Sequence, residues 1–574
     1  MNDQTTRAGH HWGPTYLGGD TWRIATWAPN ASDVVVRIDD RDTPLTQGDG
    51  GWFAGDVTGR AGDAYHLIVD GTAHVDPAAR WLPDGVAGPA RLCAPVAPDV
   101  PAPPVDWPAV TILEIHVGTF TTEGTFAAAA ARMAGVAALG ITAVEIMPVA
   151  AFSGHRGWGY DGVMPYAVHP DYGTPQDLAR LVDAIHAAGM LAILDVVYNH
   201  FGPEGASLPS VAPAFFDADR TTPWGPGIDY TQDPVRRFFI DNAVIWARDF
   251  GFDAFRLDAV HQIVDPSPVH ILTEMAAALR SALPDRPVPL IAEDERNLAE
   301  GRDAGVITAN WNDDYHHAVH CLLTGEDESY YANFAVDPIT DIARALAEGH
   351  VEQGQPRANG TRGAPSAHLP PTAFVNSNQT HDQVGNRAQG ERLITLTDPG
   401  ALRVAHAMLL CAPAIPMLFM GEEEGARAPF LFFADYEGEM ADAVRKGRAA
   451  EFAAFAQFGG PVPDPLSRDT FERSRPYAAP ASDAAEWRAL TKRCLAWRAA
   501  ALVPLLRSGP AAPPDVAPTG TAALRARWTF GAGRVEMIAH LGTVPDTPAP
   551  LRNPDLTIGD PAGPNYLAVK ATTP

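Results

Sequence analysis

Three acidic residues stand at the ends of apolar segments, where a carboxylate could act as a nucleophile or as an acid and base: Asp258, Glu293 and Asp382. Asp258 follows Arg256 by two positions, and because side chains alternate along a strand, both point to the same side. A guanidinium beside a carboxylate keeps it ionised and orients it, as a nucleophile requires. A structural ion pair inside a barrel is the alternative, and the spacing alone does not decide between them.

Glu293 ends a segment of Leu and Ile, and an apolar setting raises the pKa of a carboxyl group, as a general acid needs at neutral pH. Asp294 and Glu295 are competing candidates, and an exposed acidic turn is the alternative interpretation. Two carboxylates that flank a bond, one as nucleophile and one as acid and base, are the minimum for retaining glycoside hydrolysis. Asp382 is a third carboxylate, which would orient sugar hydroxyls.

The segment HRGWGYDG (155–162) supplies two aromatic residues, Trp158 and Tyr160, just beyond the second predicted strand. Sugar rings present C–H faces that pack on flat side chains, so both residues are candidate sugar contacts. Packing within the loop is the alternative for both.

The polar residues follow strand-like segments that alternate with Ala-rich helices, which is typical of βα units and a parallel sheet. Eight segments are predicted strands: TILEIHV (111–117), ITAVEIMP (141–148), LAILDVVY (191–198), FDAFRLD (252–258), PLIAE (289–293), VITANW (306–311), TAFVNSN (372–378) and IPMLFM (415–420). Helices are predicted over 126–140 and 175–189, the second ending at Gly189, and a helix over 486–500 completes the set. The pattern predicts a (β/α)8 TIM barrel, whose catalytic groups lie at the carboxyl ends of the strands.

Two smaller β domains are expected to flank the barrel. Residues 1–104 contain short strands separated by Asn-, Asp- and Gly-rich turns, as in a carbohydrate-binding-like β-sandwich, and the proline-dense stretch 93–108 is a stiff connector. Residues 105–508 then form the catalytic barrel with insertions. After a break at 509–520, strand-like segments indicate a small β domain over 509–574.

The chain has 42 Lys and Arg against 69 Asp and Glu, a net charge of −27. This charge repels phosphate backbones and anionic lipids, and no basic stretch offsets it, so nucleic acid and membranes are excluded as leading partners. The apolar run from Ala401 to Met420 contains Arg403, His406 and two prolines. It therefore predicts a buried helix and a buried strand, not a membrane span.

The cysteines are far apart in the sequence and form no CxxC pair: Cys93, Cys321, Cys411 and Cys494. This pattern argues against a disulfide framework and against a zinc knuckle. The first residues, MNDQTTRAGHHWGPTY, lack the charged-then-apolar order of a secretory signal. A cytoplasmic protein is expected.

Four motifs, in this order and after these strands, resemble the motif regions of the α-amylase superfamily of glycoside hydrolases: DVVYNH (195–200), FRLDAVH (255–261), IAEDE (291–295) and THDQ (380–383). The resemblance implies that Asp258 is the nucleophile, Glu293 the general acid and base, and Asp382 the carboxylate that stabilises the transition state. Further residues of these motifs and of the 155–162 segment are predicted to bind substrate: Trp158, Tyr160, Asp161, Asp195, His200, Arg256, His261, His381 and Gln383.

Several longer stretches are similar to the maltooligosyltrehalose trehalohydrolase family: 113–126, 151–163, 310–326, 418–452 and 462–474. That resemblance implies hydrolysis of the α-1,4 bond next to a terminal trehalose unit, which releases trehalose and a maltooligosaccharide in trehalose biosynthesis. The implied ligands are maltooligosyltrehalose and α-glucan oligosaccharides. The resemblance also implies a functional pairing, through the shared substrate, with a synthase that forms the trehalose end.

A metal is not expected. His316 and His320 have the spacing of ligands on one helix face, with His317 between them, but the cluster lacks the glutamate of HExxH, and its likeness to the family segment accounts for it. Asn199 matches a residue that often binds calcium in α-amylases, whereas the trehalohydrolases resemble a calcium-free branch. The resemblance therefore implies no metal and no cofactor.

The chain departs from the family pattern at two positions. Thr380 stands where the superfamily usually has Asn, a change that should be tolerated. Glu424 stands where Trp is expected, which removes an aromatic ring near the barrel mouth and leaves the preferred chain length open.

Three other functions stay open at this point. A glycogen-branching transferase has the same barrel and carboxylates, and a general α-glucan hydrolase would cleave inside starch-like chains. An amylase-like barrel that only binds sugars should have lost a working carboxylate, yet all three are present. The longer similar stretches favour the trehalohydrolase.

Overall fold

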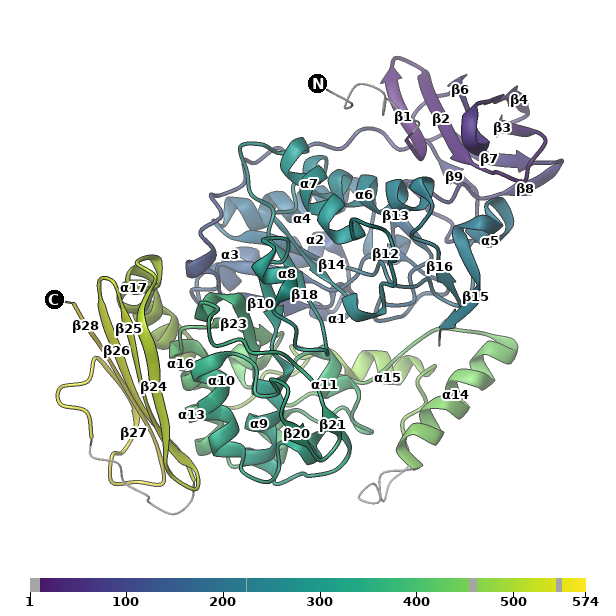
Figure 1. Ribbon diagram of the computed structural model, residues 1–574. Helices are drawn as coiled ribbons and strands as arrows, with labels where there is room; N and C mark the ends of the chain where they lie inside the picture. The colour runs from purple at the N-terminus through teal and green to yellow at the C-terminus, as the bar shows by residue number, and fades with distance from the viewer. Residues whose placement is uncertain (1–10, 223–224, 454–461, 543–549, 574) are drawn as a thin grey trace.

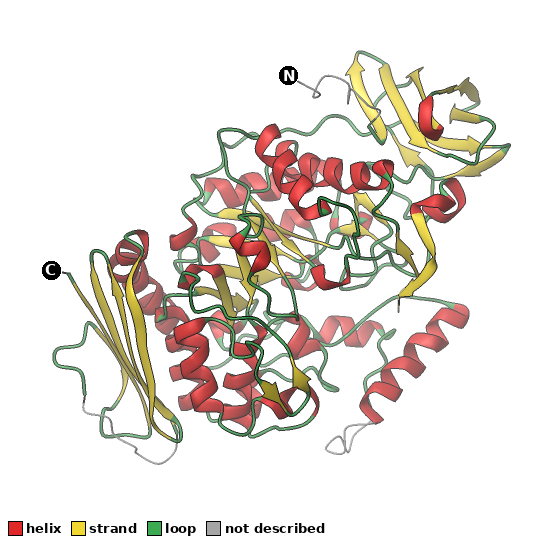
Figure 2. Ribbon diagram, viewed as in Figure 1, coloured by secondary structure: helices red, strands yellow, loops and turns green. Residues whose placement is uncertain are grey.

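The computed structural model describes residues 11–222, 225–453, 462–542 and 550–573. A barrel forms the centre of the molecule, with the amino-terminal sheets at one end and a five-stranded sheet at the other (Figure 1). Figure 2 shows the helices gathered around the barrel strands, whereas both flanking parts consist mainly of strands. The predicted fold class is confirmed.

The amino-terminal part is a sandwich of two antiparallel sheets, with strand orders β1-β2-β6-β5 and β4-β3-β7-β8, and β9 pairs with β7. Trp22, Val36, Phe53 and Leu67 are buried in the core that the two sheets share, as the alternating pattern of the strands requires. The strand bounds are β1 Gly13–Gly18, β2 Thr21–Trp27, β3 Val34–Ile38, β4 Arg41–Pro44, β5 Thr46–Gln47, β6 Trp52–Thr58, β7 Ala64–Val69, β8 Thr72–His74 and β9 Ala90–Arg91.

All eight predicted barrel strands pair in parallel and in chain order, and the barrel closes where β10 pairs with β23. Ile112, Ile193 and Ile291 form an apolar layer near the amino ends of the strands. The charged layer that includes Glu114 and Arg256 lies nearer the carboxyl ends, as the predicted barrel requires. The bounds are β10 Ile112–Ile115, β11 Ala143–Ile146, β14 Leu191–Val196, β17 Ala254–Leu257, β18 Leu290–Ala292, β19 Ala309–Trp311, β22 Phe374–Ser377 and β23 Ile415–Phe419.

Helices and short hairpins connect the barrel strands. The helix bounds are α1 Val117–Phe120, α2 Phe126–Ala130, α3 Met133–Ala137, α4 Pro175–Ala187, α5 Leu208–Val211, α6 Asp233–Arg248, α7 Ile271–Ala282, α8 Glu300–Asp303, α9 Asp313–Thr324, α10 Pro338–Glu348, α11 His381–Gly385, α12 Leu393–Leu396, α13 Pro399–Cys411, α14 Gly438–Ala453, α15 Arg468–Arg473, α16 Ala484–Trp497 and α17 Val503–Arg507. The hairpin bounds are β12 Ala150–Ala151 with β13 Met164–Val168, β15 Phe216–Thr222 with β16 Gly225–Ile228, and β20 Pro356–Arg357 with β21 Gly360–Thr361.

Two predicted helices show how local sequence sets helix ends. Thr174 and Asp177 form a capping box at the start of α4, and Gly189 follows the helix with a φ of +77°, which glycine adopts without strain. The single helix predicted over 126–140 is wrong, because a turn at residues 131–132 divides it into α2 and α3. Arg132 at this turn donates from Nη1 to the main-chain oxygen of Phe120.

The carboxyl-terminal sheet has the strand order β24-β25-β26-β28-β27. The break predicted at 509–520 is wrong, because β24 occupies it despite four prolines. β24 is an edge strand with several register shifts, where a proline without an N–H group removes no hydrogen bond from the sheet interior. The bounds are β24 Pro510–Gly520, β25 Ala523–Phe530, β26 Gly533–Leu541, β27 Leu556–Gly559 and β28 Asn565–Thr572.

The connector that follows the sandwich has no helix or strand from residue 92 to 106, as its prolines predict. The domain boundaries at residues 104 and 508 stay predictions. The apolar run 401–420 forms most of α13 followed by β23, both buried. Among the described residues, no helix is both long and apolar enough to cross a membrane. Residues 1–10, which bear on the prediction of no secretory signal, lie outside the described residues.

Trp12 joins the sandwich to the barrel. It is 1% exposed, its ring meets Phe238 of α6 edge-on with centroids 5.1 Å apart, and its Nε1 donates to the main-chain oxygen of Pro234 at 2.9 Å. Trp52 and Phe215 also contact this ring edge-on. One tryptophan therefore packs between the sandwich and the helix layer of the barrel.

Replacing Trp12→Ala should weaken the docking of the sandwich on the barrel by about 3–5 kcal/mol, because a large buried ring is lost. Hydrogen exchange followed by mass spectrometry should then show faster exchange in β1 and in the first turns of α6. Tyr16→Ala, which removes a 41% exposed ring from β1, the strand that follows Trp12, is the matched control and should leave exchange in α6 unchanged. Equal exchange in α6 for the Trp12 variant and the unchanged chain would contradict this account of the docking.

Candidate active site

Arg256, on β17, holds three carboxylates at the carboxyl end of the barrel. Its Nη1 donates to both oxygens of Asp195 at 2.9 Å and to Oδ1 of Asp258 at 2.8 Å, and its Nη2 donates to Oε2 of Glu293 at 2.6 Å. The side chain is 1% exposed, and its guanidinium lies 4.3 Å from the ring centroid of Trp311. The carboxylates that the motifs predict on three different strands are therefore gathered around one buried cation.

Asp258 is held in the ionised form. Burial alone would raise its pKa, but the charges of Arg256 and His200 and the hydrogen bonds from Asn199 and Arg256 lower the pKa below its usual value. Asn199 Nδ2 donates to Oδ2 of Asp258 at 2.8 Å, opposite the oxygen that Arg256 binds. An ionised carboxylate fixed at both oxygens has the state and orientation that a nucleophile needs.

The pKa of Glu293 is shifted in the opposite direction from that of Asp258, although both bind the same guanidinium. Burial raises the pKa of Glu293 well above its usual value, the Arg256 charge opposes this, and the charges of Asp258 and Asp382 add to the rise. Ala259, with a φ of +39°, turns its N–H toward Glu293 and donates to Oε2 at 3.0 Å. A carboxyl group that keeps its proton to higher pH is suited to act as a general acid.

The competing candidates beside Glu293 point elsewhere. Asp294 is paired with Arg296 at 2.8 Å, and the side chain of Glu295 is 64% exposed. His261 Nε2 lies 3.5 Å from Glu295 Oε1, and the contact of His261 with substrate stays a prediction. Of the three neighbouring acids, only Glu293 therefore bonds to Arg256 among the described contacts.

Asp382 lies in the first turn of α11. Thr380 is the N-cap of this short helix and forms a capping box with Gln383, so the threonine at this position still caps the helix. Asn386 Nδ2 donates to Oδ1 of Asp382 at 2.7 Å. Gln383 is committed to the cap and to a 3.2 Å hydrogen bond with Asp313, and its contact with substrate stays a prediction.

His381 is tied to Glu114, a residue that the sequence analysis missed. The main-chain N of His381 donates to Oε2 of Glu114 at 3.0 Å, and its Nδ1 pairs with Oε1. Burial would lower the pKa of His381, but the charge and hydrogen bond of Glu114 raise it above its usual value. The only sequence signal for Glu114 is a charged residue inside an apolar strand.

Tyr160 and Trp158 take different positions. Tyr160 donates from its hydroxyl to Oδ2 of Asp195 at 2.6 Å, and its ring stacks on His381 with centroids 4.9 Å apart. Trp158 is 7% exposed, donates to the main-chain oxygen of Leu431 and packs against Phe430. Tyr160 thus belongs to the Arg256 cluster. Trp158 packs outside this cluster, and the contact of Trp158 with substrate stays a prediction.

The remaining predicted substrate residues lie around this cluster. Burial lowers the pKa of His200, whose Nε2 lies 2.8 Å from the main-chain oxygen of Tyr160. Asp161 accepts a hydrogen bond from Tyr436 at 2.7 Å, and burial raises the pKa of Asp161. Burial also raises the pKa of Asp195 to about 6 against the charge of Arg256.

Two further acids near the site were not predicted. Burial, reinforced by the charge of Asp382, raises the pKa of Asp313 at the start of α9 to about 6. Glu145 lies beside Glu114 in register on β11, fully buried, and burial raises its pKa well above the usual value. Like Glu114, Glu145 is a charged residue in an apolar strand.

The predicted metal-like histidines have other partners. His316 Nδ1 lies 2.6 Å from the main-chain oxygen of Asn378, and His320 Nε2 lies 2.7 Å from Glu326 while its ring stacks on Tyr331. Within the ranges that the structure describes, no group of three or more His, Cys, Asp or Glu side chains is arranged to hold a metal ion. Asn199 donates to Asp258, so its side-chain nitrogen faces the proposed nucleophile.

Glu424, the second departure from the family pattern, lies in the turn after β23. Glu424 is ion-paired with Arg488 of α16 at 3.2 Å. Its carboxylate therefore connects the turn after β23 to the helix layer.

The His381 pair generates a testable prediction. Glu114→Gln removes the anion that raises the pKa of His381, so burial should then dominate and move the pKa below that of an ordinary histidine. In the unchanged chain, the stability from this pair is complete below the unfolded pKa and is lost as pH rises through the higher folded pKa. NMR titration of labelled histidine should report the fall, with the exposed Glu123→Gln as control. An unchanged His381 titration in Glu114→Gln would refute the assigned cause.

The alpha-amylase catalytic-domain family model matches residues 114–211, which begin in β10 and end with α5. The malto-oligosyltrehalose trehalohydrolase of Deinococcus radiodurans is 41% identical over 473 residues, which cover 80% of this chain and 77% of the relative. The protein of the same name from Saccharolobus solfataricus is 39% identical, covering 78% and 80%. A Salmonella typhimurium crystal structure, provisionally described as an alpha amylase, superimposes with a TM-score of 0.91 at 41% identity, covering 98% of this chain and 99% of that one. The chain therefore belongs to the malto-oligosyltrehalose trehalohydrolase family of the α-amylase superfamily.

Proposed function

We propose that this chain hydrolyses the α-1,4-glucosidic bond next to the terminal trehalose of maltooligosyltrehalose, with retention of configuration, and so releases trehalose. The observation that carries the proposal is one buried guanidinium, Arg256, bonded to both Asp258 and Glu293. Opposite pKa shifts in two neighbouring carboxyl groups support a nucleophile role for Asp258 and an acid role for Glu293. The names of the relatives support the choice of substrate.

In the first step, the Asp258 carboxylate attacks the anomeric carbon while Glu293 gives its proton to the leaving oxygen of the trehalose unit. This forms a covalent glycosyl-enzyme and releases trehalose. In the second step, Glu293 takes a proton from water, and the water oxygen attacks the anomeric carbon. The bond to Asp258 breaks, and the maltooligosaccharide leaves with retained configuration.

The other predicted site residues are proposed to position the sugar at the cleavage point. Asp382 and His381 would accept from and donate to ring hydroxyls, and Tyr160 would offer its ring to the sugar. The residues proposed to bind substrate or to support those that bind it are Trp158, Asp161, Asp195, His200, Arg256, His261 and Gln383. No metal or cofactor is part of the proposed steps.

The proposed setting is the cytoplasm, supported by four buried cysteines that are all free thiols. The proposed ligands are maltooligosyltrehalose and α-glucan oligosaccharides. A synthase that forms the trehalose end would pair with this enzyme through the shared substrate. Nucleic acid and membranes have no role in the proposal.

Product analysis tests the choice of substrate. The purified chain should release trehalose from maltooligosyltrehalose and should cleave a plain maltooligosaccharide of equal length far more slowly, as chromatography of the products would report. Asp258→Ala is the control and should release neither sugar. Equal cleavage of both substrates would replace the proposal with a general α-glucan hydrolase, and new branch points in an added glucan would replace it with a transferase.

The opposite pKa shifts predict a bell-shaped pH profile of kcat/KM. Activity should fall at acid pH only as Asp258 is protonated, below the usual carboxylate range, and at alkaline pH as Glu293 loses its proton above the usual range. Glu293→Gln should abolish the alkaline limb and slow hydrolysis by roughly 10²–10⁴-fold.

A glycosyl fluoride separates the acid role of Glu293 from a structural one, because fluoride leaves without a proton. Glu293→Gln should still form the glycosyl-enzyme from this substrate, and the exposed Glu295→Gln should match the unchanged chain on both substrates. An alkaline limb that survives in Glu293→Gln would reject Glu293 as the acid.

A further inference from the structure

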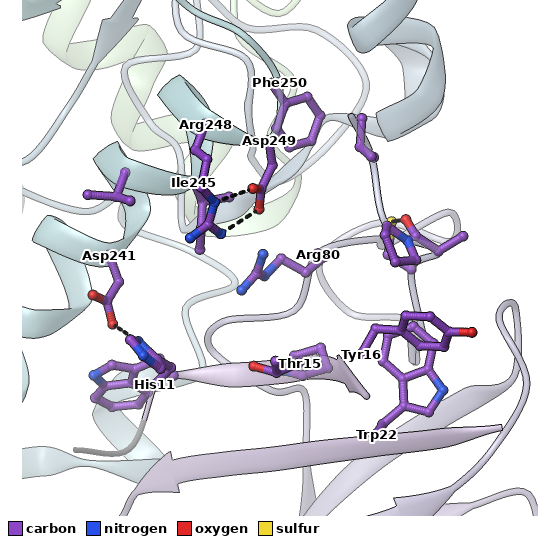
Figure 3. Close-up of a pocket in the computed structure, with 17 residues that line it drawn as sticks. His11, Thr15, Tyr16, Trp22, Arg80, Asp241, Ile245, Arg248, Asp249 and Phe250 are labelled. Atoms are coloured by element: carbon purple, nitrogen blue, oxygen red, sulfur yellow. Dashed lines mark hydrogen bonds and ion pairs between the residues drawn. The ribbon is translucent and has the colours of Figure 1, made fainter. Parts of the chain in front are cut away.

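A cavity of about 390 Å³ lies between the sandwich and the barrel (Figure 3). Its walls are β1, the connector near Cys93 and the second half of α6. From the end of α6 the chain enters β17 at its amino end, whereas Asp258 follows the carboxyl end of β17. The cavity is therefore at the other end of the barrel strands from the active site, and its volume is within the range of small-molecule sites.

Arg80 projects into the middle of this cavity (Figure 3). Its Nε is buried without a hydrogen-bond partner among the residues that the structure describes, and its guanidinium lies 5.3 Å from the ring centroid of Tyr166. A guanidinium is always charged and prefers the paired oxygens of a phosphate or carboxylate. A guanidinium aimed into a cavity can therefore bind an anion there.

The other charges of the cavity are paired with each other. Arg248 binds Asp249 through two hydrogen bonds of 2.6 and 3.0 Å, and His11 Nδ1 lies 2.9 Å from Asp241 Oδ2. Arg80 takes part in neither pair, and its charge opposes the rise that burial causes in the pKa of the nearby Asp76. The carboxylates of Asp241 and Asp249 also keep lone pairs that can accept hydrogen bonds from hydroxyl groups.

The part of the cavity wall away from these charged pairs is aromatic. Tyr16 on β1 is 41% exposed, and its ring packs on the buried Trp22 with centroids 4.9 Å apart. The underlying tryptophan holds the exposed ring in place, so that one face of a flat ligand can pack on it. The cavity thus combines a receptor for an anion, acceptors for hydroxyls and a flat apolar surface.

We propose that this cavity is a non-catalytic binding site for a phosphorylated sugar, with the phosphate on Arg80 and the sugar ring on Tyr16. A neutral glucan would leave the guanidinium without its anion, and free phosphate would leave the aromatic surface uncovered. The site needs groups from both the sandwich and the barrel, so a bound ligand would also hold these two parts together.

Calorimetric titration of the full chain tests the proposal with α-D-glucosyl phosphate as the probe, and with inorganic phosphate, glucose and maltotriose as separate titrants. Glucosyl phosphate should bind more tightly than phosphate or glucose alone. Arg80→Gln should weaken its binding about tenfold or more, because a charge-assisted hydrogen bond is lost. Arg23→Gln, which changes an exposed arginine of the same sandwich, is the matched control and should bind as the unchanged chain does.

The release of trehalose should continue at an unchanged rate in Arg80→Gln, which separates this site from the active site. If that variant does not fold, Tyr16→Ser provides a second test, since it removes an exposed ring and should also weaken binding of the probe. Three results would overturn the proposal: no binding of glucosyl phosphate up to millimolar concentrations, equal binding by Arg80→Gln, or maltotriose binding that Arg80→Gln weakens as much as it weakens binding of the phosphate.

Discussion

The buried charge of Arg256 is the interaction on which the catalytic end of the barrel depends. A cation without water must be paired, and this one binds Asp195, Asp258 and Glu293 with one guanidinium. Removing one partner of such a cluster typically costs about 3–5 kcal/mol, because the other charges then stay buried and uncompensated. Burial raises the pKa of both Asp258 and Glu293, and the charge of Arg256 lowers it. The lowering exceeds the effect of burial only at Asp258, where Asn199 and His200 also lower the pKa.

The barrel supplies the precision that this cluster needs. Asp195 and Arg256 are register partners on the neighbouring strands β14 and β17, so their side chains meet without any loop to position them. Glu293 follows β18, the next strand, and Asp382 comes from a short helix that Thr380 caps. An apolar layer nearer the amino ends fills the interior beneath these charges. Tyr160, which offers a flat ring, bonds to Asp195 at the carboxyl end of its strand.

The sequence predicted the barrel because its strands are short apolar runs that end in polar residues, and it predicted the central carboxylates because they lie in four specific motifs. It did not predict the partner of His381, since Glu114 is 267 residues away and only the closed barrel brings them together. The prolines of 510–520 indicated a break, since the sequence does not show that a strand lies at a sheet edge. For Trp158 the sequence left two alternatives, a sugar contact and packing within the loop, and its contacts with Phe430 and Leu431 form only in the folded chain.

The central claim is that the carboxylate ionised by Arg256 is the one that forms the bond to sugar. A fluorinated glucosyl fluoride that forms the glycosyl-enzyme quickly and releases it slowly would trap the adduct, and peptide mass spectrometry would locate it. The account predicts one sugar on the peptide that contains Asp258, at its carboxylate. A sugar on another carboxylate, or an active enzyme that forms no adduct, would contradict it.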